Sequence, residues 1–156
     1  MRIVSVIIFV TWFTVAAAIP QRIHFVNPPS ETPPAITSLT VDPAVLWPPN
    51  HKMVPISLQV TATGDPSPEC RIDSATSNEP GIVTGEDDWV VTGSLTMDLR
   101  AERAGSGNGR VYTVYFTATD GRGVSSNGSV TVQVPRNAGA VAVDDRLLFD
   151  STRCPF

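Results

Sequence analysis

Alternation of apolar and polar residues is the feature of this sequence that most restricts its fold. Every second residue is apolar in four stretches, which are residues 54–62, 95–101, 112–118 and 130–134. Successive side chains of an extended strand point to opposite faces, so a period of two predicts strands with one side in a core and the other in water. We therefore expect an all-β fold.

Turn-forming residues separate these stretches and indicate several further, shorter strands. The chain contains 14 prolines and 11 glycines, a number that favours many turns and few helices. Weaker strand patterns occupy residues 36–41, 70–76 and 89–91. About seven short strands over about 100 residues are typical of an immunoglobulin-like Greek-key β-sandwich, which is the architecture we predict.

The first residues indicate export. Arg2 is followed by an almost uninterrupted apolar run and then by three alanines at positions 16–18, a pattern typical of a cleaved signal peptide over residues 1–18. The alternative is a retained membrane anchor, for which the run is short. In either case we expect the remainder to be secreted, extracellular or at the cell surface.

The exported part divides into three segments by composition. Residues 19–34 form a proline-rich lead-in, residues 35–135 contain the predicted strands and form the domain, and residues 136–156 form a C-terminal tail. The chain has 11 basic and 15 acidic residues and a formal net charge of −4. It has no basic stripe that could neutralise phosphates, so we expect no nucleic-acid partner. A membrane contact is expected only where the N-terminal segment is retained.

Two cysteines, Cys70 and Cys154, lie in the exported part. An even number of cysteines in an oxidising compartment favours a disulfide, which would pin the tail to the domain. The alternative is that Cys70 is a small core residue and Cys154 a free thiol in a mobile tail.

Two aromatic residues are predicted to have structural roles. Tyr112 follows a glycine-rich corner near the start of a strand, where Greek-key sandwiches place a tyrosine whose hydroxyl bonds back to the preceding loop. The alternative for Tyr112 is an ordinary inward-facing aromatic. Trp47, between Leu46 and two prolines, is predicted to plug the core at one end of the sandwich.

Four stretches, in this order, resemble a module of secreted bacterial proteins that occurs among hyalin-repeat and other immunoglobulin-like domains. They read LWPPNHKMVPI from Leu46, CRIDSATSNEP from Cys70, LTMDLRAERAGSGNGRVYTV from Leu95 and TATDGRGVSSNGSVTVQVP from Thr117. The resemblance implies an extracellular immunoglobulin-like fold of surface or adhesive proteins without established chemistry. Relatives tend to carry a further cysteine shortly before the one that matches Cys70. Its absence here is a second reason to pair Cys70 with Cys154.

The second half is also similar to a cadherin repeat, through the strings LRAER and VYTVYFTATDGRG. This resemblance implies calcium ligands at Glu102 and Asp120, since oxygen ligands from two loops at one end of a sandwich suit Ca²⁺. The acidic linker that completes a cadherin site is absent. The alternative is that both are solvated turn acids and that the protein has no cofactor.

Few residues suggest catalysis. Glu86, Asp87 and Asp88 form an acidic group before Trp89, and paired carboxylates can serve glycoside hydrolysis, although such a run more often forms a solvated loop. His51 has no second histidine or cysteine nearby to share a metal, so a structural role in a proline-braced turn is the better interpretation.

The sequence therefore favours a secreted, non-enzymatic binding, adhesion or structural module whose partner is an extracellular protein or a polysaccharide. The alternative is a carbohydrate-binding module, which would need an exposed aromatic platform, for example Trp89 coplanar with Tyr115 on one flat face. A secreted hydrolase is a third, weaker interpretation. The adhesion hypothesis rests on analogy with the family.

Overall fold

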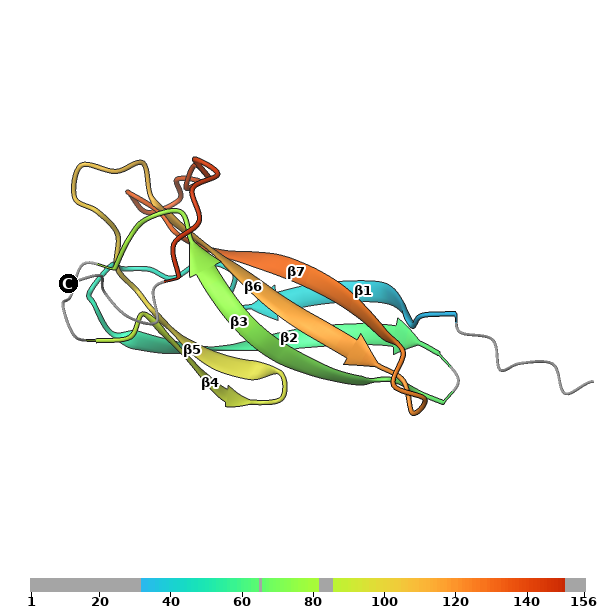
Figure 1. The fold of residues 1–156 in the computed structure, drawn as a ribbon. Coiled ribbons are helices and arrows are strands. Elements are labelled where there is room, and N and C mark those ends of the chain that lie inside the picture. The colour runs from blue at the N-terminus through green and yellow to red at the C-terminus, as the bar shows by residue number, and fades with distance from the viewer. Residues whose placement is uncertain (1–31, 65, 82–85, 151–156) are drawn as a thin grey trace, which may run out of the picture. The chain divides into compact units, whose positions relative to one another are not determined.

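Seven β-strands and no helix make up the described part of the chain, which is residues 32–64, 66–81 and 86–150 of the computed structural model (Figure 1). The predicted signal peptide, most of the lead-in and Cys154 lie outside these residues. Among the described residues no helix is long and apolar enough to span a membrane. The strands are β1 (Ala35–Asp42), β2 (Met53–Thr63), β3 (Glu69–Ser77), β4 (Trp89–Gly93), β5 (Thr96–Arg100), β6 (Arg110–Thr119) and β7 (Ser125–Val134).

The strands form two antiparallel sheets. The four-stranded sheet has the order β1-β2-β5-β4, and the three-stranded sheet has the order β3-β6-β7. The prediction of an all-β sandwich is thereby confirmed. Lettered A to G along the chain, the sheets read A-B-E-D and C-F-G, which is also the strand order of immunoglobulin constant-type domains.

The core lies between the sheets and contains the apolar rows expected from the alternation. Met97, Val114 and Phe116 are completely buried. Burying a side chain of this size stabilises the fold by about 1.5–3 kcal/mol, so the row spacing largely determines which face of each strand turns inward. The core cluster comprises Leu46, Ile56, Leu58, Ile72, Ala75, Met97, Leu99, Ala101, Tyr112, Val114, Phe116, Val132 and Val134.

The chain changes sheets directly after β1. β1 pairs with β2, whereas Val45 forms a parallel bridge with Gln133 of β7. The Leu46 N–H donates to the Gln133 carbonyl at 2.8 Å, and the Gln133 N–H donates to the Ala44 carbonyl at 3.0 Å. Residues 44–46 therefore cover one end of the outer edge of β7.

Part of the C-terminal tail lies on the domain as a segment that we call the C-terminal strap, residues 139–150. Its Phe149 forms an antiparallel bridge with Ser77, the last residue of β3. The two backbone hydrogen bonds of this bridge measure 2.8 and 3.0 Å. The strap thereby extends the edge of the three-stranded sheet.

Candidate functional site

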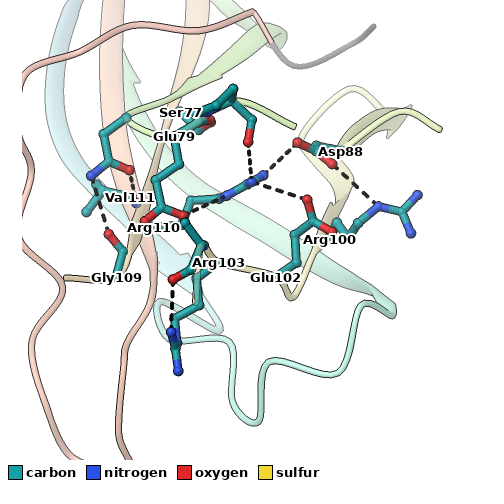
Figure 2. A network of polar contacts seen from close by, with 12 residues as sticks. Ser77, Glu79, Asp88, Arg100, Glu102, Arg103, Gly109, Arg110 and Val111 are labelled. Atoms are coloured by element: carbon teal, nitrogen blue, oxygen red, sulfur yellow. Dashed lines mark hydrogen bonds and ion pairs between the residues drawn. The ribbon is translucent and has the colours of Figure 1, made fainter. Parts of the chain in front are cut away.

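Candidate residues from separate parts of the sequence come together at the end of the sandwich where β6 begins. Asp88 directly precedes β4, Glu102 follows β5 by two residues, and Arg110 opens β6. Figure 2 shows both carboxylates turned toward the Arg110 guanidinium. Asp88, Glu102 and Arg110 are all completely buried, so this end of the sandwich contains a buried ion-pair network.

Arg110 is the centre of this network. Its Nη1 lies 2.6 Å from Asp88 Oδ2, its Nη2 lies 3.2 Å from Glu102 Oε1, and its Nε lies 3.7 Å from Glu79 Oε2. Nη2 also donates to the Pro80 carbonyl at 2.7 Å. The planar fork of arginine suits such simultaneous contacts, and one guanidinium thus joins three separate segments of the chain, at residues 79–80, 88 and 102.

Arg100, at the end of β5, forms a second layer of the network. Its Nη2 lies 2.8 Å from Glu86 Oε2 and donates to the Asp87 carbonyl at 2.9 Å. Its Nη1 donates to the His51 carbonyl at 3.0 Å, and its Nε lies 3.5 Å from Asp88 Oδ1. Two of the three acidic residues before Trp89, Glu86 and Asp88, are therefore paired with arginine, and the run is not simply a solvated loop.

Burial controls the electrostatics of the network. It is the main cause that raises the pKa of Asp88, while the neighbouring Arg110 acts in the opposite direction. Burial alone would lower the pKa of Arg110, but Tyr112 and Asp88 outweigh it and raise that pKa, so the guanidinium stays charged. Asp88 and Glu102 are buried in contact with Arg110, so the arrangement can hold loops together. Neither carboxylate faces solvent, where a substrate would bind.

The network also holds the loop of residues 47–50. On one side, Leu46 is bonded to β7, as described above. On the other, the His51 N–H donates to the Ala101 carbonyl at 2.9 Å, and the Ala101 N–H donates to the Lys52 carbonyl at 2.8 Å. His51 Nδ1 lies 3.1 Å from Glu102 Oε2. His51 is thus a structural contact of this turn.

Trp47 does not plug the core, contrary to the sequence-based prediction. Its exposed fraction is 46%, whereas that of Leu46 is 1%. The bonds of residues 44–46 to β7 keep this segment extended, so neighbouring side chains point in opposite directions and only one of the two can face inward. Leu46 fills the core, and the Trp47 indole is exposed on the loop of residues 47–50, which is fixed at both ends and which we call the Trp47 loop tip.

The Tyr112 hydroxyl forms a hydrogen bond with a residue earlier in the chain, as expected from the position of Tyr112. Its hydroxyl donates to the Arg100 carbonyl at 2.8 Å and accepts from Arg110 Nη1 at 3.0 Å. The side chain is completely buried. The bond reaches the end of β5 and not the loop that follows it, and Tyr112 thereby joins the two sheets and the network.

Glu102 and Asp120 do not come together, which corrects the predicted calcium site. Glu102 contacts Arg110 at the start of β6, whereas Asp120 follows the last residue of that strand, about 30 Å away at the rise of a β-strand. Asp120 Oδ1 instead accepts the N–H groups of Arg122 and Val124, both at 2.9 Å, and so closes the β6–β7 turn. No group of three metal-ligating side chains occurs among the described residues.

The aromatic platform that a carbohydrate-binding module would need does not form from Trp89 and Tyr115. Trp89 belongs to the four-stranded sheet and packs partly buried against the core. Tyr115 lies in the three-stranded sheet between Val114 and Phe116, both buried, and so faces outward from that sheet. The two rings therefore lie on different sheets.

Cys70 is half-buried near the start of β3, and burial raises the pKa of its thiol. Its predicted partner, Cys154, lies outside the described residues, so the disulfide remains a prediction. The strap restricts it, because Phe149 is bonded to Ser77, about 23 Å along β3 from Cys70. With only four residues between Phe149 and Cys154, pairing requires a nearly extended chain or release of Phe149.

Sequence reasoning missed Arg110, the residue on which the network depends. Arg110 precedes Tyr112 by two positions and therefore shares its inward face, in line with Val114 and Phe116. A charged residue on the inward face of a strand needs oppositely charged partners, because an unpaired buried charge is strongly unfavourable. That rule, applied to the row, would have predicted acidic partners for Arg110, although not which acidic residues they are.

Comparison of the chain with protein-family models, with curated proteins and with solved structures finds no match.

Proposed function

We propose that this protein is a secreted, non-enzymatic binding or adhesion module with an immunoglobulin-like Greek-key fold, and that it contacts an extracellular protein through the Trp47 loop tip. The order of the strands in the two sheets supports the fold assignment. The exposure of Trp47 on a loop fixed at both ends is the observation that carries the functional proposal.

A fixed tryptophan is well suited to binding. Tryptophan provides a large apolar area with a single N–H donor and is enriched among the residues that dominate binding energy. Ordering a flexible loop on association costs free energy, and the bonds at Leu46 and His51 remove much of that cost beforehand. Val45, with an exposed fraction of 43%, adds apolar surface beside the tip.

The contacts of the acidic residues favour binding over hydrolysis. A glycoside hydrolase needs two carboxyl groups that face the same bound sugar, whereas Asp88 and Glu102 both face Arg110 from inside the protein. A protein partner is preferred to a polysaccharide because Trp89 and Tyr115 lie on different sheets.

Adhesion of beads coated with the secreted protein to the cells that produce it tests this function. Trp47→Ala should reduce adhesion about tenfold, the usual cost of a dominant interface residue, without changing the melting temperature. Val90→Thr is the matched control, since Val90 is equally exposed at 45% on β4, and it should adhere like the wild type.

Treatment of the cells identifies the partner class. Protease treatment should abolish adhesion if the partner is a protein, whereas loss only after periodate oxidation would reassign the site to a polysaccharide. Full adhesion by Trp47→Ala would refute a role for the tip.

A further inference from the structure

The C-terminal strap has a second unusual surface, made of apolar side chains that point into solvent. The exposed fractions of Val141, Val143 and Leu148 are 76%, 52% and 68%. Leu147 and Phe149 are exposed as well, at 53% and 36%. Scattered exposed apolar residues are ordinary, but five within nine positions of one segment are typical of an interaction site.

The backbone of the strap is nevertheless held in place. Asn78 Nδ2 donates to the Val143 carbonyl at 3.0 Å, while Asn78 Oδ1 accepts the Val111 N–H at 2.7 Å. The Ala142 N–H donates to Gln133 Oε1 at 2.8 Å. Together with the Phe149–Ser77 bridge, these bonds fix the direction in which the apolar side chains point.

The inward position of this segment is occupied by a small side chain, while the larger apolar ones face outward. Ala142 is buried against Gly109, and a Cβ placed on Gly109 would lie 2.7 Å from the Ala142 Cβ. The Ala142 side chain therefore leaves no room for a side chain at position 109. The alternation of the strap is therefore the reverse of that in a core strand, with alanine inside and valine outside.

Acidic side chains accompany this apolar row. Asp144, Asp145 and Asp150 are exposed along the same segment, against one basic residue, Arg146. Asp145 accepts a hydrogen bond from Asn108 Nδ2 at 3.0 Å, and Asp144 accepts the Arg146 N–H at 2.8 Å, so both positions are ordered. Complementary charge across an interface steers association and selects partners, so a cationic rim is the matching surface.

We propose that the C-terminal strap binds a protein partner whose surface combines an apolar groove with lysine and arginine side chains at its rim. The strap carries more acids than bases and the whole chain has a net charge of −4, which disfavours both an anionic lipid surface and a second copy of this chain. This inference goes beyond the function proposed for Trp47 and holds whether or not that tip binds.

A short peptide of alternating leucine and lysine serves as the probe, with the alternating leucine and glutamate peptide as its counterpart. The full secreted protein should bind the lysine peptide in calorimetry, more weakly as salt is added, and should bind the glutamate peptide at least about tenfold more weakly. The double variant Leu147→Ser, Leu148→Ser should lose about tenfold in affinity for the lysine peptide.

Two further variants separate this surface from general attraction to an acidic protein. Asp144→Asn keeps the oxygen that accepts the Arg146 N–H, so it should retain the fold and weaken binding a few-fold. Val90→Thr with Val91→Thr removes comparably exposed valines from β4 and should bind like the wild type.

Several outcomes would overturn the proposal. One is unchanged binding in the leucine double variant, and another is equal affinity for both peptides. Cosedimentation with vesicles of phosphatidylcholine and phosphatidylglycerol, lost in the double variant, would assign the strap to a membrane. A wild-type dimer that the double variant converts to a monomer in sedimentation analysis would assign the strap to a second copy of the chain.

Discussion

The guanidinium of Arg110 contacts carboxylates from three different segments of the chain, those of Glu79, Asp88 and Glu102. Removing such groups from water is expensive, and the mutual attraction in the interior offsets that cost only while the partners stay in place. The network is therefore sensitive to the loss of any one charge, and most sensitive to the loss of the charge that the others share.

Arg110→Met should reduce the free energy of unfolding by about 3–5 kcal/mol, because it leaves buried carboxylates without a cation. Urea unfolding followed by tryptophan fluorescence measures the change. Arg71→Met is the matched control: the Arg71 side chain is 73% exposed and pairs with Asp73 at 3.3 Å, so its loss should cost at most about 1 kcal/mol. Equal losses in the two variants would mean that the network contributes no more than a surface pair.

At the residue scale, the sequence predicts whether a side chain faces the core or the solvent better than it predicts which residue that side chain contacts. The alternation at residues 112–118 predicts that Tyr112 faces inward, and the glycine-rich corner before it predicts its hydrogen bond. Leu46 and Trp47 show the opposite case. Two adjacent apolar residues do not indicate which of them faces the core, and only the backbone bond to Gln133 turns Leu46 inward. Which carboxylates meet at Arg110 depends on tertiary pairing with residues at separations from 8 positions for Glu102 to 22 for Asp88, and no local pattern encodes it.

Among the elements, the strands with strong alternation were predicted close to their observed bounds. The row at residues 112–118 corresponds to β6, Arg110–Thr119, and the row at 54–62 corresponds to β2, Met53–Thr63. β7 extends further toward its N-terminus than its row at 130–134, because its first residues lie at a sheet edge where polar side chains and Gly128 replace apolar ones. The strap lies in the segment predicted as a C-terminal tail, in which residues 140–143 could add a strand and residues 147–149 could dock on the sandwich; side-chain amides and one bridge hold it, not an apolar face.

The close approach of β6 to the strap depends on Gly109. Gly109 has a φ of 112°, a region that side chains rarely adopt, and an added Cβ would also meet Ala142. Gly109→Ala should therefore destabilise the domain by more than about 1 kcal/mol and make the strap an early site of limited proteolysis. Gly105→Ala is the control, because an added Cβ there has no atom within 4 Å. A strap as resistant in Gly109→Ala as in the wild type would contradict this account.

At the scale of the whole molecule, the buried network predicts an unusual response to acid. Burial raises the pKa of Asp88 in the folded protein, so between its unfolded and folded pKa values the folded state binds more protons than the unfolded state. The contribution of Asp88 to stability is then fully present below the unfolded pKa and is lost as pH rises through the folded one.

The free energy of unfolding of the wild type, compared with that of Asp88→Asn, should accordingly increase as pH falls from neutral to about 4. Urea titrations of both proteins across this range measure the difference, and taking the difference cancels the titration of groups common to both. A wild type that loses stability relative to Asp88→Asn on acidification would show that pairing with Arg110 outweighs burial.

The change of sheet after β1 has a mechanical consequence. Residue Pro34, just before β1, accepts a hydrogen bond from Ser126 at one end of β7, and the strap is bonded to Gln133 at the other. A pull between these two points runs along the strands, whereas hydrogen bonds between antiparallel strands lie across them. The bonds of β1 are then sheared together and do not open one after another, and residues 44–46 carry the same tension into the second sheet. A chain tethered through these two ends would bear load on both sheets at once.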